Sequence, residues 1–226
     1  KLEETDAYQL IKVVQKAADT ILSPIGWNKL EYSEKFEKSL IMHHAKQGVM
    51  KVTQLSDGIK NMLGMVADIA YRCALLNSHL GTVAGEETAG VVMIDEVDMH
   101  LHPHWQQTVL SSLTQAFPKL QFIVTTHSPQ VLTTAPSECI RIIDEGQVYA
   151  APKGSQGAEA SRLLETIFKV KSRPPQQENT KKLKRYTDLV YSDKWSCEEA
   201  QILRNELNEI YANEEPQLLD LDLYIE

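Results

Sequence analysis

Two short apolar runs, about 30 residues apart, constrain the fold of this chain more than any other feature. Residues 91–94 and 122–125 are each too short for a helix, and such runs are typical of strands buried in a sheet. Residues 105–117, between them, carry apolar side chains at helical spacing. A strand, a helix and a strand at this distance predict a right-handed parallel crossover, the basic unit of an α/β fold.

The remaining periodicities complete a prediction of the elements. Apolar residues at helical spacing predict helices over 4–22 and 59–76, the second with Ser56 or Asp57 as its N-cap. Three short segments, at 27–32, 39–44 and 49–52, indicate a small antiparallel hairpin. Residues 140–143 and 148–150 predict a hairpin that closes the main sheet. From Ala158 onward the pattern is helical.

Composition excludes several classes of protein. No apolar run approaches the roughly 18 to 20 residues of a bilayer span, and the first residues lack the apolar stretch of a signal peptide. The three cysteines are far apart and in no CxxC pair, which argues against a disulfide framework and a cysteine-based zinc site. We therefore expect a cytoplasmic protein. The net charge of −8 argues against a surface that is basic throughout.

Charged and polar side chains follow both predicted strands. Asp95 and Glu96 come directly after the first strand, and His127 follows the second. The carboxyl ends of parallel strands are where open α/β sheets bind ligands. An aspartate there can hold Mg²⁺, a glutamate can orient or deprotonate a water, and a neutral imidazole can contact a γ-phosphate. Taken singly, each feature also has a structural interpretation, as an acidic loop after a strand or an ordinary loop histidine.

A third feature lies at the head of the long helix. Residues 55–58 read Leu-Ser-Asp-Gly, and a helix N-terminus attracts phosphate through its free N–H groups and its dipole. Gly58 would let the backbone approach a ligand closely. As a bare pattern the same residues also describe a plain N-cap.

In their order along the chain, these three features resemble the C-terminal half of an ABC-type ATPase head of the SMC and DNA-repair class. LSDGIK at 55–60 is similar to the signature motif, VVMIDEVDMHLHP at 91–103 to Walker B plus the D-loop, and TTHSPQVL at 125–132 to the switch-histidine strand. The strings DEVDMHLHPHWQ and THSPQVL further resemble the stand-alone ATPases of bacterial defence systems. These are the PtuA-like ATPases of Septu and some retron systems, which work beside an HNH nuclease.

The resemblance implies an architecture. We expect an α/β fold, an ABC-type ATPase lobe with a mostly parallel sheet flanked by helices, plus a C-terminal helical extension. Residues 1–154 would form the C-terminal part of the ATPase head, and residues 155–226 a helical tail.

The resemblance also implies a cofactor and roles at matching positions. The ligands would be ATP and Mg²⁺, with Asp95 positioning the metal, Glu96 polarising water and His127 sensing the γ-phosphate. The remaining positions would serve the partner protomer of a head-to-head dimer. The signature residues Ser56, Asp57 and Gly58 would contact the nucleotide that the opposite protomer holds. Asp98, in the D-loop, would lie across the dimer interface.

One motif of the ATPase family does not occur in these residues. The chain has no G-x-x-x-x-G-K-[ST] loop to cradle phosphates. It also begins without a methionine. We expect a fragment that lacks the lobe carrying this loop and is inactive by itself.

The function expected from these features is that of an ATPase subunit of a bacterial anti-phage defence complex. It would form a homodimer or higher oligomer through its heads and regulate an associated HNH-type nuclease. One alternative is a non-hydrolytic ATPase-fold scaffold that holds a nuclease and a nucleic-acid sensor; the presence of Glu96 favours hydrolysis. Another is a DNA-repair or OLD-type ATPase, which would need a Toprim domain that the sequence does not show.

Two further clusters have weaker interpretations. Residues 169–185 hold seven Lys or Arg against one Glu and could bind nucleic acid, retron DNA or RNA, although a solvated helix face is the favoured interpretation. His100, His102 and His104 could bind zinc, but Pro103 interrupts their spacing and no carboxylate or cysteine completes a ligand set.

Overall fold

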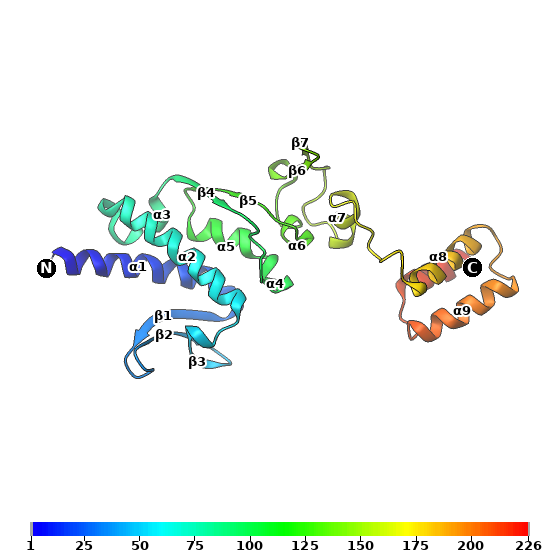
Figure 1. Cartoon of the computed structure of the whole chain (residues 1–226), viewed down its shortest axis with the longest axis horizontal. Coiled ribbons are helices and arrows are strands. Elements are labelled where there is room, and N and C mark those ends of the chain that lie inside the picture. The colour runs from blue at the N-terminus through cyan, green and yellow to red at the C-terminus, as the bar shows by residue number, and fades with distance from the viewer. Residues whose placement is uncertain (1, 226) are drawn as a thin grey trace. The chain divides into compact units, whose positions relative to one another are not determined.

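The computed structural model describes residues 2–225 and divides into two compact units (Figure 1), one up to Leu163 and one from Leu164. The helices of the first unit are α1 (Leu2–Leu22), α2 (Asp57–Leu76), α3 (Ala84–Glu87), α4 (Pro103–Gln106), α5 (Val109–Ala116) and α6 (Pro129–Leu132), and α7 (Ala160–Thr166) spans the boundary. Its strands are β1 (Trp27–Ser33), β2 (Ser39–His44), β3 (Gly48–Lys51), β4 (Gly90–Ile94), β5 (Leu120–Val124), β6 (Arg141–Asp144) and β7 (Gln147–Ala150). The mixed α/β fold with a parallel strand pair is confirmed.

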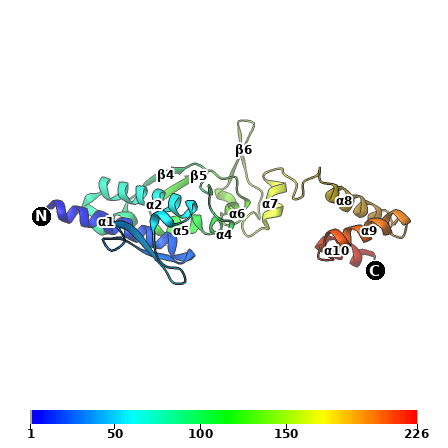
Figure 2. The ribbon, with the colours of Figure 1, turned by 60° about the horizontal axis from the view of Figure 1, so that its bottom comes forward.

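The core of the first unit lies between long helices and the parallel pair. α1 and α2 pack along each other, and α5 packs against α1 (Figure 2). Buried side chains of these helices, Leu22, Val66 and Leu113 among them, form one cluster with the inward side chains of β4 and β5. This cluster fixes the position at which both strands end.

The parallel pair differs from the prediction in its burial. β4 and β5 pair in register from Gly90 with Leu120 to Ile94 with Val124. The prediction that the first strand is fully buried is wrong, since Val91 and Met93 are 59% and 78% exposed. Side chains alternate between the two faces of a strand, and within the described residues only the inward face is covered by the core.

The antiparallel sheets lie apart from this pair. β1, β2 and β3, which follow α1 and precede α2 in the sequence, form a three-stranded antiparallel sheet. This sheet is larger than the predicted hairpin. β6 and β7 pair with each other as predicted, but they form a separate two-stranded sheet and do not close the main one. The main sheet therefore consists, within residues 2–225, of β4 and β5.

The helix predicted between the two strands is divided in two. α4 ends at Gln106 and α5 begins at Val109. At the break, the backbone N–H and the hydroxyl of Thr108 both donate to the carbonyl of Trp105, at 3.0 and 3.2 Å. These short-range bonds replace the helical hydrogen bonds there, so the chain turns. The apolar face of α5 is buried as expected, with Val109, Leu113 and Ala116 in the core.

The second unit is helical, as the pattern predicts. It contains α8 (Glu178–Tyr191), α9 (Glu198–Ile210) and α10 (Pro216–Ile225), which share a core of their own. Arg204 of α9 binds both carboxylate oxygens of Asp222 of α10, at 2.5 and 2.6 Å. In the part of the chain that the structure describes, no helix is long and apolar enough to cross a membrane.

Candidate functional site

The two strands of the parallel pair end at one edge of the sheet. Ile94 of β4 pairs with Val124 of β5, so Asp95 and Glu96 follow one strand where Thr125 and His127 approach from the other. Both carboxylates and the imidazole are exposed. The structure thus brings the acidic pair and the histidine segment to the same edge, as the parallel crossover predicts.

Thr125 connects the two strand ends. Its hydroxyl donates to Oδ1 of Asp95 at 2.5 Å and accepts the N–H of Glu96 at 2.8 Å. Its backbone donates to the carbonyl of Ile94 and accepts the N–H of Val97, both at 3.0 Å. Thr125 has no predicted role from sequence, although a hydroxyl residue at the end of the neighbouring strand is a usable indication.

Glu96 has an unusual backbone. Its φ is 50°, in the left-handed region that a residue with a side chain seldom adopts. Such a conformation costs roughly 1 kcal/mol or more and persists where surrounding contacts hold it. Here Thr125 binds its N–H and the preceding and following residues are tied to β5.

A second hydroxyl holds the loop after β4. Thr126 donates to Oδ1 of Asp98 and accepts the N–H of Ser128 at 3.0 Å. The buried hydroxyl of Ser128 donates to Gln106 at 2.7 Å, and Gln106 donates to the carbonyl of Leu101 at 3.0 Å. Asp98 is therefore held within its own chain. Sequence reasoning missed Thr126 and Gln106, because their contacts depend on how the two loops meet.

The N-terminus of α2 is the third part of the predicted site. Ser56 is the N-cap and is exposed, and its side chain makes no capping hydrogen bond. Lys60 contacts Asp57 at 2.8 Å, and this hydrogen bond, together with the lysine charge, holds the pKa of Asp57 below its ordinary value. The two side chains at the tip thus remain accessible.

Gly58 is buried, unlike the exposed residues Ser56 and Asp57 before it. A methyl group added there would overlap the carbonyl oxygen of His100 and contact the ring of Trp105. The structure brings Gly58 to the loop after β4, within one chain. Among the described residues, no hydrogen bond or ion pair joins Ser56 or Asp57 to the strand edge.

One histidine of this loop, His102, has a structural role. Nδ1 of His102 accepts the N–H of His104 at 3.3 Å and caps α4. Within residues 2–225, no three side chains of the His, Cys, Asp and Glu types are grouped so that they could hold a metal ion. The zinc interpretation of these histidines therefore gains no support.

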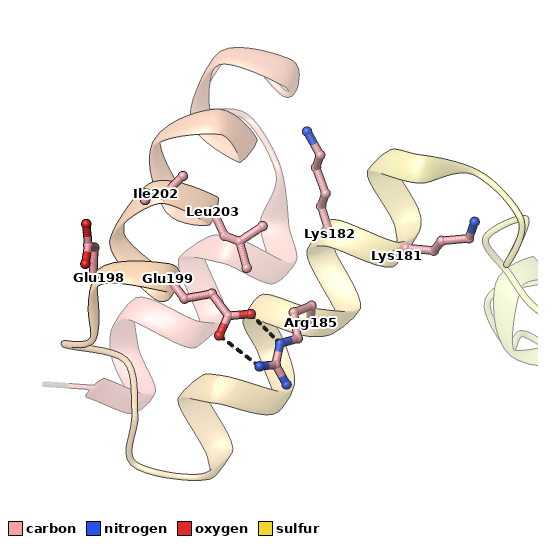
Figure 3. Close-up of a pocket in the computed structure, with 7 residues that line it drawn as sticks. All are labelled: Lys181, Lys182, Arg185, Glu198, Glu199, Ile202 and Leu203. Carbon is pink, nitrogen blue, oxygen red and sulfur yellow. Dashed lines mark hydrogen bonds and ion pairs between the residues drawn. The ribbon is translucent and has the colours of Figure 1, made fainter.

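The basic stretch is paired with carboxylates in the second unit. A groove of about 560 Å³ between α8 and α9 (Figure 3) has charged walls and two apolar side chains; it is lined by Lys181, Lys182, Arg185, Glu198, Glu199, Ile202 and Leu203. Arg185 binds both oxygens of Glu199, at 2.6 and 2.8 Å. Three more cations of the stretch form ion pairs of 2.6 to 2.7 Å: Arg173 with Glu215, Lys181 with Glu178 and Lys182 with Glu206. This pairing reduces the charge available to a nucleic acid and agrees with a solvated helix face.

Comparisons with known proteins agree with the resemblance stated from the motifs. The chain is 44% identical over 177 residues to a "Retron Ec83 probable ATPase" of Escherichia coli, a match that covers 78% of this chain and 32% of that protein. It is 33% identical over 203 residues to a "Retron Vc95 probable ATPase" of Vibrio cholerae serotype O1 biovar El Tor, which covers 85% of this chain and 38% of that protein. A "Septu protein PtuA" of Bacillus mycoides (strain KBAB4) is 40% identical over 123 residues, 52% of this chain and 16% of that protein.

The chain spans about a third of the length of the two retron relatives. A solved structure from work on ATP-driven dimerisation of SMC ATPases aligns with a TM-score of 0.46 and 18% identity, over 69% of this chain and 91% of that one. Residues 8–133, more than half of the chain, match a family model described as "AAA domain, putative AbiEii toxin, Type IV TA system". The chain therefore belongs to this AAA domain family, and it is similar to retron ATPases and to Septu PtuA.

Proposed function

We propose that this chain contributes to a nucleotide-hydrolysing ATPase head and that the edge formed by the ends of β4 and β5 is half of its active site. The observation that carries the proposal is the convergence of two exposed carboxylates and an exposed histidine at that edge. Family membership and the names of the retron relatives support ATP as the nucleotide.

The residues at this edge fit a magnesium ion. Mg²⁺ is commonly held by one or two carboxylates, with water and substrate phosphates as its other ligands. Asp95 is exposed, and Oδ1 is the oxygen that binds Thr125, so Oδ2 is the oxygen directed to a ligand in this proposal. When bound, Mg²⁺ would neutralise charge on the phosphate oxygens.

Glu96 and His127 have the chemistry for the water and for the terminal phosphate. The carboxylate of Glu96 would accept a hydrogen bond from the attacking water and take its proton. His127 has no hydrogen bond or ion pair to any other described residue, so its imidazole is free to contact the γ-phosphate. Catalysis here rests mainly on positioning and charge, which is typical of phosphoryl transfer.

In the proposed dimer, the tip of α2 would complete the site of the opposite protomer. Ser56 and Asp57 are exposed and would meet the phosphates of that site together with the helix N–H groups. Gly58 is buried, so we assign it the close packing of the tip on His100 and no direct contact with nucleotide. Asp98 would lie near the interface in a loop that Thr126 holds.

The biological setting proposed is anti-phage defence, because the relatives are retron ATPases and Septu PtuA. In it, ATP-driven engagement of the heads would regulate a separate HNH-type nuclease. Nucleic-acid binding by residues 169–185 is a weaker part of the proposal, because four of its cations are already paired.

Glu96→Gln tests the hydrolysis proposal in the intact protein. The substitution keeps the shape of the side chain and removes the base, so ATP turnover should fall at least a hundredfold, on the order of the loss of a general base, while ATP binding persists. Glu145→Gln is a matched control, because Glu145 is also exposed and has a φ of 49°. Unchanged turnover in Glu96→Gln would remove Glu96 from the mechanism, whereas the absence of turnover in the wild-type protein would favour the scaffold alternative.

Ser56→Arg tests the composite site. A long cation at the exposed tip should prevent two heads from engaging, so ATP-dependent dimerisation measured by light scattering should be lost. The protomer should fold normally, because Ser56 is exposed and makes no side-chain capping bond. Ser78→Arg, at another exposed serine, is the control. Normal engagement of Ser56→Arg would contradict the assignment of the tip.

A further inference from the structure

We infer that Thr125 is a positioning residue that sets the directions of the Asp95 and Glu96 carboxylates. The inference rests on the proposed function, in which these two side chains serve the metal and the water. It adds a third residue, which would touch neither nucleotide nor water and would act through its neighbours.

Thr125 directly follows β5, next to the end of β4. This one residue forms hydrogen bonds with four consecutive residues of the other strand end: Ile94, Asp95, Glu96 and Val97. Two of the four bonds come from the backbone, at 3.0 Å each, and any residue at position 125 could form them. The other two, to Asp95 and Glu96, require the hydroxyl.

The hydroxyl of Thr125 donates one hydrogen bond and accepts another. A hydroxyl has one proton to donate. The N–H of Glu96 donates to Oγ1 of Thr125, so the hydroxyl proton is free to go to Oδ1 of Asp95, at 2.5 Å. Hydrogen bonds in such a chain strengthen one another, and the last acceptor is a carboxylate. The hydroxyl therefore holds one oxygen of Asp95 and leaves the other for a ligand.

The hydroxyl of Thr125 also supports the unusual backbone of Glu96. Its φ of 50° is costly for a residue with a side chain. The bond from its N–H to Thr125 helps to hold this conformation. Without the hydroxyl, the peptide before Glu96 would lose that partner and could turn toward a relaxed conformation. The carboxylate of Glu96 would then point elsewhere.

Thr125→Val and Thr125→Ser test the inference in the intact protein. Valine keeps the branched shape and removes the hydroxyl, so kcat for ATP should fall on the order of tenfold while KM for ATP changes less than about twofold. The Mg²⁺ concentration that gives half-maximal rate should rise. Serine restores the hydroxyl and should recover most of kcat. Thr114→Val is the matched control, since that hydroxyl bonds only to carbonyls of its own helix, at 3.0 Å.

The outcomes separate this inference from the proposed function. Wild-type kcat in Thr125→Val, with Glu96→Gln inactive, would overturn the inference and leave the function in place. Equal turnover in wild type and Glu96→Gln would remove Glu96 from the mechanism, and the absence of turnover in the wild-type protein would overturn the proposed hydrolysis itself. A third outcome is that Thr125→Val raises KM for ATP and lowers the melting temperature, and that Thr125→Ser does not restore kcat. This outcome would show a merely structural role for Thr125 and would also overturn the inference. If the valine variant does not fold, Thr125→Cys compared with Thr125→Ser gives the same test, because the two unbranched side chains differ mainly in that a thiol is a weak hydrogen-bonding group.

Discussion

Single residues decide how the loops around the strand edge meet. Gly58 lets the first turn of α2 lie directly on the carbonyl of His100, where no side chain would fit. His100 itself has a φ of 62°, so the loop bends sharply at the point of contact. Close approach of two backbones is a use of glycine that does not need an unusual φ.

Gly58→Ala should therefore destabilise the chain. The added methyl group meets a backbone oxygen that cannot rotate away, and we expect a loss of about 1 to 3 kcal/mol in the free energy of unfolding. Gly64→Ala, in the same helix, has nothing within 4 Å of the added methyl group and should instead stabilise by up to about 1 kcal/mol. Urea denaturation of both variants checks the pair. Equal effects of the two substitutions would contradict the close contact.

The three cysteines should differ in reactivity. Cys73 is buried, and burial raises the pKa of its thiol, so little thiolate forms at neutral pH. Cys139 is exposed and Cys197 is half-buried. A thiol reagent at pH 7.5 should label Cys139 first and Cys73 only after denaturant is added, as mass spectrometry of the peptides would show. Rapid labelling of Cys73 in the native protein would show that α2 is not packed as described.

Some residues of the edge could be predicted from sequence and others could not. At three positions an apolar run has just changed to polar residues: Asp95, Glu96 and His127. Such a change indicates the end of a strand, whatever strand it pairs with. Thr125 and Thr126 stand at the same kind of position, but their importance depends on which atoms face them across the sheet. The burial of Gly58 depends on a loop about 40 residues away, and no local pattern indicates it.

At the scale of elements, an ion pair ties the start of α10 to the chain before α8. Arg173 contacts Glu215 at 2.6 Å, and Glu215 also accepts the N–H of Gln217 at 3.1 Å. Burial by itself raises the pKa of Glu215, but the hydrogen bonds from Arg173 and Gln217 and the arginine charge outweigh it, so the net pKa is lowered. The pair thus holds one end of α10 in the second unit.

Arg173→Ala should loosen α10. It leaves the buried carboxylate of Glu215 without its cation, and we expect a loss of about 1 to 3 kcal/mol. Because the folded pKa of Glu215 is lowered, this contribution is present above roughly pH 4.3 and disappears as pH falls through the folded pKa. Amide hydrogen exchange of α10 checks both statements. Lys181→Ala, which removes an exposed i,i+3 pair, should cost only about 0.2 to 0.5 kcal/mol.

Helices were easier to predict than the surroundings of the strands. The period of 3.6 residues identifies α1 and α2, and it indicates helical structure from Ala158 onward, because these helices bury one side against a core. The run VVMI places apolar residues on both faces of the strand, so it predicts a strand that is buried on both faces. In the structure, β4 buries only one of its two faces. The turn at Thr108 was missed because its residues fit a helix equally well and only the hydrogen bonds to Trp105 break it.

At the scale of the whole molecule, the outward face of the parallel pair is an exposed apolar surface. Val91, Met93 and Ile123 are exposed there, on two adjacent strands. Exposed apolar side chains on neighbouring strands form a contiguous patch, and such patches favour association with other molecules. This face is therefore expected to promote association of the chain in solution.

Met93→Lys should reduce that association. The side chain is 78% exposed, so the charge costs little folding stability, while binding of a hydrophobic dye and concentration-dependent light scattering should both fall. The neighbouring residue Ile94 packs against the core, and Ile94→Lys should instead lower the free energy of unfolding by several kcal/mol, roughly the cost of burying an unpaired charge. Equal loss of stability in both variants would show that the outward face is not exposed.

The left-handed backbone of Glu96 has a consequence for how variants of this protein would be selected. Glycine or asparagine would relieve the conformational cost at position 96, so a screen for heat resistance alone should enrich those two residues there. A screen for survival that depends on turnover should return glutamate. The two screens would then favour different residues at position 96. Such a difference would show that the glutamate at this position lowers thermal stability and is kept for turnover.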